Sequence, residues 1–426
     1  QLQMSPTASS DRLQRLQQRI QSNPTAPTIV YVTLQKTAED VASFLRQNKI
    51  NAQHYHAGMK ADERELIQNQ FMNGEVNCIV ATIAFGMGID KSNIRCVVHY
   101  DLPKSIENYA QEIGRSGRDG ENALCEILAN NDSLQVQENF VYGDTPEREA
   151  IQQLIEQIAD CRGSLWEIKL TTLSNELNIR ALPLKTLLVY LELAGVIEPK
   201  FTYFEEYAFK STENTHNIIN LFKGERQQFI QALFDNCVVK KTWTYVDIQA
   251  IMDNYSTNGK PVDRSRILTA LEWLDEQGHL DLQAKLAVER YDVTSNDIDV
   301  PSLSQHMHQL FLNKEQSEIQ RIHSMIALFE SDQCISKLMA EYFGDSNSAE
   351  HCGHCSVCTQ GAASFKSNKA LPNLSNLNAG QLTDALSQTM KSKMSVHNAT
   401  KFLCGIHTPI FTRLQVRALP KFGTLE

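Results

Sequence analysis

The sequence predicts an α/β fold at its N-terminal end, with a parallel sheet that is covered by helices on both faces. The prediction depends on short apolar segments, rich in β-branched residues, that alternate with segments of helical periodicity. Strands separated by helices pair in parallel, because each helix carries the chain back to the same edge of the sheet. The predicted strands are residues 29–32, 52–56, 78–81, 96–99 and 124–128.

The helices between these strands are predicted from apolar residues spaced three and four positions apart. Residues 38–46 and 62–71 have such a face, and a third helix, residues 105–113, leads into a segment rich in Gly and Arg. Ligands bind at the carboxyl ends of the strands in sheets of this kind. A binding site is therefore expected at the loops of residues 82–90 and 114–120.

Arg115 and Arg118 lie three positions apart in the segment QEIGRSGRDG, residues 111–120. Two guanidinium groups held close together can clamp phosphate oxygens, because each offers a planar fork of donors. The glycines of the segment let a ligand approach where a Cβ atom would clash. The same composition also fits a solvated loop, but the surrounding strands and helices favour the phosphate site.

Residues 29–132 resemble the second motor domain of a RecQ-type helicase of superfamily 2. The resemblance rests on four segments that match the motifs of this family in order and spacing. It implies a RecA-like fold and ATP-driven unwinding of DNA in the 3′ to 5′ direction. The four segments are YHAGM at residues 55–59, VATIAFGMGIDK at 80–91, VHYDLPKS at 98–105 and QEIGRSGRDG at 111–120.

The resemblance also implies roles for single residues. Arg115 and Arg118 match the arginines that reach the ATP phosphates, and Arg118 matches the finger that stabilises charge in the transition state. Gln111 matches the polar residue that opens this motif. One segment departs from the family, which usually has an Asn-Ser-Arg-like triplet where this chain has Thr-Leu-Gln at residues 33–35.

Three further positions follow from the same resemblance. Gly88 and Asp90 match residues beside the nucleotide, and Thr82 matches a residue that contacts the DNA backbone. The sequence contains no Gly-x-x-x-x-Gly-Lys-[Ser/Thr] loop, which cradles phosphates and positions Mg²⁺. We therefore expect a fragment that lacks the first motor domain. Such a chain does not hydrolyse ATP alone and uses ATP and Mg²⁺ only within a complete enzyme.

The composition indicates a multi-domain protein with local, rather than general, affinity for nucleic acid. The chain has 426 residues and a formal net charge of −10, so DNA contacts require local basic patches. No apolar run approaches the ~20 residues of a membrane span, and the first residues do not form a signal peptide. We expect an intracellular protein, of a bacterial cytoplasm or a nucleus, with reduced cysteines and no membrane contact.

Four of the ten cysteines, Cys334, Cys352, Cys355 and Cys358, have the spacing of a metal site. Four thiolates suit tetrahedral Zn²⁺, and a closed shell of this kind is structural rather than catalytic. A disulfide is the alternative, and His351 and His354 lie within the cluster as possible substitute ligands. The cluster resembles the zinc module of the RecQ family.

Residues 144–300 are expected to form two winged-helix domains, each with two helices followed by a hairpin. The first hairpin is expected from residues 195–197 and 201–210, and the second from residues 278–280 and 286–293. A winged helix places its second helix near a DNA duplex, which makes Lys185, Arg264 and Arg266 candidate DNA contacts.

The aromatic residues of the first hairpin allow two interpretations. Tyr203, Phe204 and Tyr207 can stack on bases or can pack a core, and the core interpretation carries more weight. The neighbouring glutamates repel phosphate and also weigh against base stacking.

The expected domains are the motor domain, two winged helices, a long helix with the zinc module, and a linker with a small helical region. Two functions remain open. The chain is either the C-terminal part of a helicase that acts on junctions of single-stranded and duplex DNA, or a zinc-containing regulator with a relic motor domain. Arg115, Arg118, Asp90 and Gln111 favour the helicase. The five domains are residues 1–143, 144–224, 225–300, 301–362 and 363–426.

Overall fold

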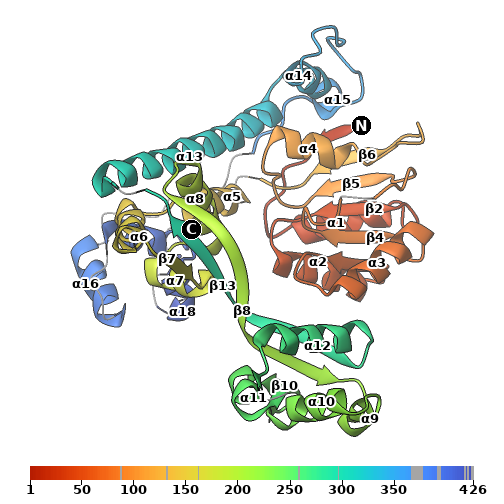
Figure 1. The fold of residues 1–426 in the computed structure, drawn as a ribbon. Coiled ribbons are helices and arrows are strands. Elements are labelled where there is room, and N and C mark those ends of the chain that lie inside the picture. The colour runs from red at the N-terminus through yellow and green to blue at the C-terminus, as the bar shows by residue number, and fades with distance from the viewer. Residues whose placement is uncertain are drawn as a thin grey trace. The chain divides into compact units, whose positions relative to one another are not determined.

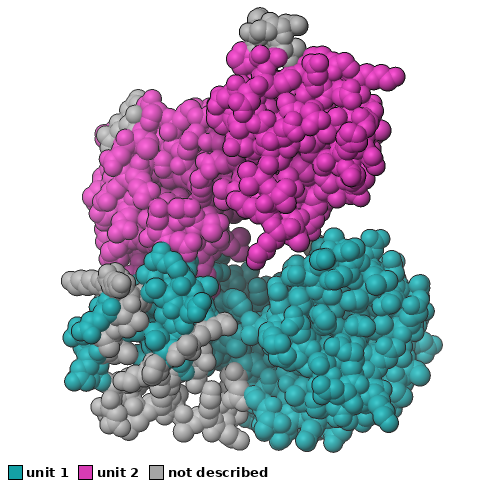
Figure 2. Space-filling model, turned by 90° about the horizontal axis from the view of Figure 1, so that it is seen from below, with its two compact units in different colours: residues 1–145, 309–426 teal, residues 146–308 magenta. Residues whose placement is uncertain are grey.

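The computed structural model divides into two compact units. Unit 1 comprises residues 1–145 and 309–426, and unit 2 comprises residues 146–308 (Figure 2). The structure describes residues 1–426 except 87–88, 131–132, 162, 258–259, 296, 366–377, 391–394, 417–418, 420–421 and 424–426.

The sheet of unit 1 has six strands in the order β1-β6-β5-β2-β4-β3 (Figure 1). Every neighbouring pair is parallel. The RecA-like parallel sheet expected from the sequence is thereby confirmed. Its strands are β1 (Leu2–Met4), β2 (Thr28–Tyr31), β3 (Ala52–Tyr55), β4 (Cys78–Ala81), β5 (Cys96–His99) and β6 (Leu124–Ile127).

Helices cover both faces of this sheet, so its central strands are buried on both sides. Leu16 and Leu45 belong to the hydrophobic cluster on one face, and Ile67 and Phe71 to the cluster on the other. This burial explains why the strands are short, nearly continuous apolar runs. The helices of this domain are α1 (Arg12–Gln21), α2 (Gln35–Gln47), α3 (Ala61–Asn73), α4 (Ile106–Ile113) and α5 (Leu134–Gly143).

Three of these elements, β1, α1 and α5, were not expected from the sequence. The strand β1 has only three residues and pairs in parallel with β6 at the edge of the sheet, from Leu2 opposite Cys125 to Met4 opposite Ile127. A segment this short has no recognisable alternation of apolar and polar residues. Residues 2–4 are therefore part of the sheet.

In the second part of unit 1, α13 and α14 pack on the motor sheet, whereas α16 to α18 have a hydrophobic cluster of their own. Tyr109 on α4 and Phe329 on α13 are both fully buried in one hydrophobic cluster, with ring centroids 5.0 Å apart. The N–H of Met4 donates to the hydroxyl of Ser356 at 3.1 Å, which ties β1 to α15. The helices of this part are α13 (Val300–Glu330), α14 (Ile335–Tyr342), α15 (Ser356–Gln360), α16 (Ala379–Met390), α17 (Val396–Leu403) and α18 (Pro409–Arg413).

Unit 2 is built on an antiparallel sheet in the order β7-β13-β8-β10-β9. Two of its strands are long: β8 (Ile197–Ser211) has 15 residues and β13 (Leu280–Val293) has 14. They pair from Ile197 opposite Val293 to Ser211 opposite Leu280. The other strands are β7 (Leu165–Ile168), β9 (Cys237–Lys240), β10 (Trp243–Val246), β11 (Ser256–Thr257) and β12 (Lys260–Pro261).

The two separate hairpins expected from the sequence are wrong. Residues 201–210 form a single strand with no turn, and their partner is β13, about 80 positions later, in one continuous ladder. The helices within residues 215–276 lie between β8 and β13 in the sequence (Figure 1). The helices of unit 2 are α6 (Arg148–Asp160), α7 (Leu170–Leu177), α8 (Ala181–Leu193), α9 (Thr215–Asn220), α10 (Glu225–Asp235), α11 (Ile248–Asn254) and α12 (Arg264–Glu276).

The expected linker at residues 368–378 lies outside the described residues except for its last position. Among the helices that the structure describes, none combines the length and the apolar character that crossing a bilayer requires.

Candidate functional site

Arg118 and Asp90, both expected beside the nucleotide, meet on the surface of the motor domain. A guanidinium nitrogen of Arg118 lies 3.3 Å from a carboxylate oxygen of Asp90, and the side chains are 42% and 92% exposed. The Nε atom of Arg118 also donates to the carbonyl oxygen of Gly114 at 3.1 Å. Arg118 is therefore positioned from its own segment and remains open to solvent.

Arg115 is held differently, because its guanidinium turns back onto the loop that follows β4. It is half-buried and donates to the carbonyl oxygen of Gly86. A Cβ atom on Gly86 would lie 2.5 Å from a guanidinium nitrogen of Arg115, so a larger residue there displaces the arginine. The two arginines thus stand next to the two loops that the sequence predicted as the binding edge.

Tyr31, the last residue of β2, lies beside Arg115. Burial raises the pKa of its phenol, and the charge of Arg115 partly opposes this rise. The hydroxyl donates to the carbonyl oxygen of Phe85 at 3.2 Å. The phenol is thus neutral and fixes the start of the loop that contacts Arg115.

Three other residues of the motor domain, Gln111, Thr82 and Gly88, were expected to contact nucleotide or DNA. Gln111 is exposed on α4, and Thr82 is buried directly after β4, 9% exposed. Gly88 lies outside the described residues. The roles of these three residues stay predictions.

The atypical segment at residues 33–35 is held by the partly buried carboxylate of Asp101. The N–H of Thr33 donates to Asp101 at 2.8 Å, and burial raises the pKa of Asp101. A guanidinium nitrogen of Arg12 lies 3.5 Å from the same carboxylate, and the Arg12 side chain is 5% exposed. Sequence reasoning missed Arg12, because Asp101 and its other partners, Asn130 and Ser133, lie about 90 to 120 positions away.

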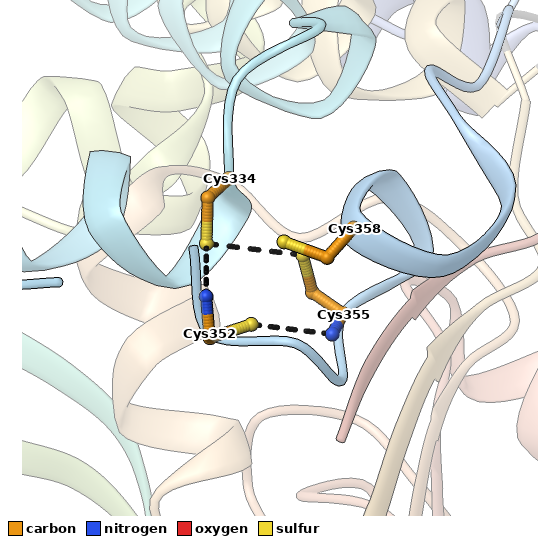
Figure 3. Close-up of side chains that lie close together, drawn as sticks. All are labelled: Cys334, Cys352, Cys355 and Cys358. Atoms are coloured by element: carbon orange, nitrogen blue, oxygen red, sulfur yellow. Dashed lines mark hydrogen bonds between the residues drawn. The ribbon is translucent and has the colours of Figure 1, made fainter. Parts of the chain in front are cut away.

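The four predicted metal ligands come together in unit 1 (Figure 3). The sulfur atoms of Cys334, Cys352, Cys355 and Cys358 all lie within 4.8 Å of one another. Cys334 precedes α14 and Cys355 precedes α15, so two helix starts place the thiols. Two sulfurs, of Cys334 and Cys355, are 4.0 Å apart.

This geometry fits Zn²⁺. Tetrahedral coordination with Zn–S bonds of about 2.3 Å separates the sulfurs by about 3.8 Å, close to the distances observed. Backbone N–H groups also point at the thiols: that of Cys352 lies 3.4 Å from the sulfur of Cys334, and that of Cys355 lies 3.2 Å from the sulfur of Cys352. Such donors stabilise thiolates, which are the metal-binding form.

The pKa of Cys352 reflects this arrangement. Burial alone raises the pKa of the thiol, but hydrogen bonds from Ser336 and from two backbone N–H groups outweigh it and lower the pKa to about 5. These hydrogen bonds thus favour the thiolate of Cys352, which is the metal-binding form.

The DNA candidates of unit 2 have contrasting surroundings. Lys185 is exposed on α8. Arg264 donates to the carbonyl oxygen of Phe204, whereas Arg266 pairs with Glu225 at 2.8 Å. Both arginines are thus engaged within the unit, and the DNA-binding roles of all three residues stay predictions.

Comparison with known families gives two matches. Residues 11–120 match the helicase conserved C-terminal domain, and residues 299–359 match the RecQ zinc-binding domain. The second match contains all four cysteines of the cluster. The chain contains the C-terminal region of a RecQ-type helicase.

Curated relatives agree with this assignment. The ATP-dependent DNA helicase Q-like 5 of Arabidopsis thaliana is 25% identical over 80% of this chain and 38% of its own length. The ATP-dependent DNA helicase RecQ of Bacillus subtilis is 41% identical over 32% of this chain and 23% of its own length. The bifunctional 3′-5′ exonuclease/ATP-dependent helicase WRN of Mus musculus is 48% identical over 24% of this chain and 7% of its own length.

The matched part of each of these RecQ-type relatives is thus well under half of its length. Almost the whole of unit 2 lies between the two family matches of the chain. The zinc module follows unit 2 in the sequence, yet it shares a hydrophobic cluster with the motor sheet.

Proposed function

We propose that this chain supplies the second motor domain and the DNA-contacting region of an ATP-dependent DNA helicase that moves 3′ to 5′. ATP binds between this motor domain and a first motor domain that carries the phosphate loop and positions Mg²⁺. Arg118 is the arginine finger, and Arg115, Gln111, Gly88 and Asp90 complete this side of the ATP site.

The observation that carries the proposal is the exposed guanidinium of Arg118. An arginine finger has to reach across an interface to a ligand on another lobe, so its side chain cannot be buried in its own domain. Arg118 meets this requirement, because its carboxylate partner Asp90 is itself 92% exposed. An exposed pair of this kind contributes little to stability, so exchanging Asp90 for a phosphate has a small cost.

The ATPase test combines this chain with a separately produced first motor domain of a RecQ-type helicase and measures DNA-stimulated ATP hydrolysis. Arg118→Ala is expected to lower kcat by about 10³-fold or more, the usual contribution of an arginine finger. The matched control is Arg321→Ala, because Arg321 forms an exposed pair with Glu318 at the same 3.3 Å distance, on α13.

The two variants separate the candidate functions. An unchanged kcat for Arg321→Ala together with the loss for Arg118→Ala supports the helicase. If the reconstituted mixture binds DNA but hydrolyses no ATP, the proposal fails and the alternative of a zinc-containing regulator with a relic motor domain is supported.

The zinc module has a structural role in this proposal. Zn²⁺ bound to four thiolates has no open position for a substrate, so it holds the segment between α14 and α15 rather than taking part in ATP hydrolysis. DNA is the proposed partner, with Thr82, Lys185, Arg264 and Arg266 as candidate contacts.

A further inference from the structure

One surface of unit 2 combines amines and aromatic rings on the outer face of its sheet. Side chains alternate along a strand, so residues two apart share a face. On β10, Val246 is buried in the hydrophobic cluster of the unit, and Trp243 and Tyr245 therefore point to the opposite face. On β8, Phe209 is likewise buried, and Lys210 points outward.

The register of the sheet brings further lysines to the same outer face. Trp243 lies opposite Lys240 on β9, and Lys285 on β13 lies opposite Glu206 on β8. The Nζ atom of Lys285 donates to the hydroxyl of Tyr245 at 3.4 Å. We call the resulting surface the lysine–aromatic face. It comprises Lys210, Lys240, Trp243, Tyr245 and Lys285.

The amines lie directly over the rings. The Nζ atoms of Lys210 and Lys285 are 4.5 Å and 4.9 Å from the ring centroid of Trp243. Those of Lys240 and Lys285 are 4.4 Å and 4.9 Å from the ring centroid of Tyr245. Each ring thus has two amino groups within 5 Å, a density of positive charge that the chain, with a net charge of −10, does not have in general.

Lys241 adds a fourth amine at the edge of this face. It lies in the two-residue turn between β9 and β10 with φ at 51°, in the left-handed region. Glycine or asparagine adopts this conformation at lower cost than lysine. A charged residue at a position that disfavours it indicates a use for the charge.

The lysines also differ from the arginines that the sequence singled out. Arg266 is neutralised by Glu225, and Arg264 donates to a backbone carbonyl. Two carboxylates, Glu206 and Asp281, lie next to the lysine–aromatic face in the register of β8 and β13. Four lysines against two carboxylates leave the face positive.

We propose that the lysine–aromatic face binds single-stranded DNA. On binding, the amines that lie over Trp243 and Tyr245 turn to the phosphates on either side, and the ring faces they leave stack on unpaired bases. Binding of this type needs no base-specific hydrogen bond, because every base has a π face and every nucleotide a phosphate. The site is separate from the ATP-facing edge and does not depend on the proposed function of Arg118.

The first test measures the affinity of the full chain for a fluorescein-labelled oligothymidylate of about 16 nucleotides, the upper site size of a single stacking domain. Each phosphate contact contributes about −0.7 to the slope of log K against log salt for single strands. Lys210→Gln combined with Lys240→Gln is therefore expected to make the slope less steep by about 1.4. The matched control is Lys223→Gln, an exposed lysine between α9 and α10.

The second test examines stacking. Trp243→Ala is expected to weaken oligothymidylate binding at least about fivefold, the lower limit for loss of one stacked base. Trp243→Phe retains a ring and retains binding, but it removes the quenching of tryptophan emission by the oligonucleotide. The other tryptophans are Trp166, which is 5% exposed, and Trp273, which is 41% exposed on α12.

Circular dichroism shows whether each variant folds. If Trp243→Ala does not fold, the loss of tryptophan quenching in Trp243→Phe still tests whether Trp243 contacts the oligonucleotide. The proposal is overturned if the double lysine variant keeps the affinity and salt slope of Lys223→Gln. It is also overturned if quenching persists in Trp243→Phe, or if the face binds an acidic peptide such as polyglutamate while oligothymidylate does not bind.

Discussion

At the scale of single residues, the backbone on either side of Arg118 favours glycine at two positions, for different physical reasons. Gly117 and Gly120 both have positive φ, at 62° and 83°, which side chains rarely adopt. A Cβ atom on Gly117 would also lie 2.9 Å from the carbonyl oxygen of Glu121, whereas a Cβ on Gly120 would meet nothing within 4 Å. The first position is therefore restricted by conformation and contact, the second by conformation alone.

A pair of alanine variants tests this distinction. Gly120→Ala is expected to lower the free energy of unfolding by about 1 kcal/mol, the cost of a left-handed conformation for alanine. Gly117→Ala is expected to cost more, because backbone atoms have to move as well. Urea denaturation of both variants gives the two values. Equal losses would show that the close approach to Glu121 is relieved without cost.

Single residues also show how far the sequence alone led. Arg118 and Asp90 could be placed together because both belong to motifs whose order and spacing matched a family. Arg12 could not be found, since it is an ordinary arginine in a polar segment and its buried partner Asp101 comes from a distant loop. Buried polar networks between distant segments leave no periodic trace in a sequence.

At the scale of elements, local patterns identified most of the motor domain. The strand Cys78–Ala81 was predicted with the bounds that the structure has, because its apolar run is bordered by polar loops. The hairpins of unit 2 failed, because a strand pattern does not reveal its partner. Residues 201–210 alternate as a strand should, yet they pair with a strand about 80 positions later.

The zinc module is the element most dependent on a ligand. Only α14, α15 and the segment between them hold the four thiols, and the cysteines themselves are part of its hydrophobic cluster. Removal of Zn²⁺ with a chelator is expected to unfold this module, because separated thiolates repel one another and little core remains. The six-stranded sheet is expected to persist.

Hydrogen exchange before and after chelation measures both parts of this prediction. Protection is expected to fall in α14 and α15 and to stay in β2, β4 and β5. The ligands bind the metal as thiolates, so protons compete with Zn²⁺ and acid is expected to release the metal. Loss of metal already at neutral pH, or no change in exchange, would contradict this account.

At the scale of the whole molecule, the sheet of unit 2 packs against two separate groups of helices. The base of the ribbon formed by β8 and β13 packs with α7 and α8, where Trp166 is buried, and its far part packs with α9 to α12. Between these parts Leu286 has φ at 55°, and a register shift of the ladder lies within the base, between Arg290 and Tyr291. The far part has a complete hydrophobic cluster of its own, from Tyr207 to Leu280.

This division predicts that the far part is removable. Residues 205–286 are replaced by Asn-Gly, which joins Phe204 to its opposite residue Ala287 through a two-residue hairpin turn. The shortened chain is expected to fold, because the removed cluster contributes no residue to the cores of unit 1. Trp166 should keep the blue-shifted emission of a buried indole, and one Zn²⁺ should remain bound per chain. Oligothymidylate binding by the lysine–aromatic face should disappear with the deleted residues. Red-shifted emission of Trp166 or loss of zinc would instead show that the two parts of unit 2 fold as a single cooperative body.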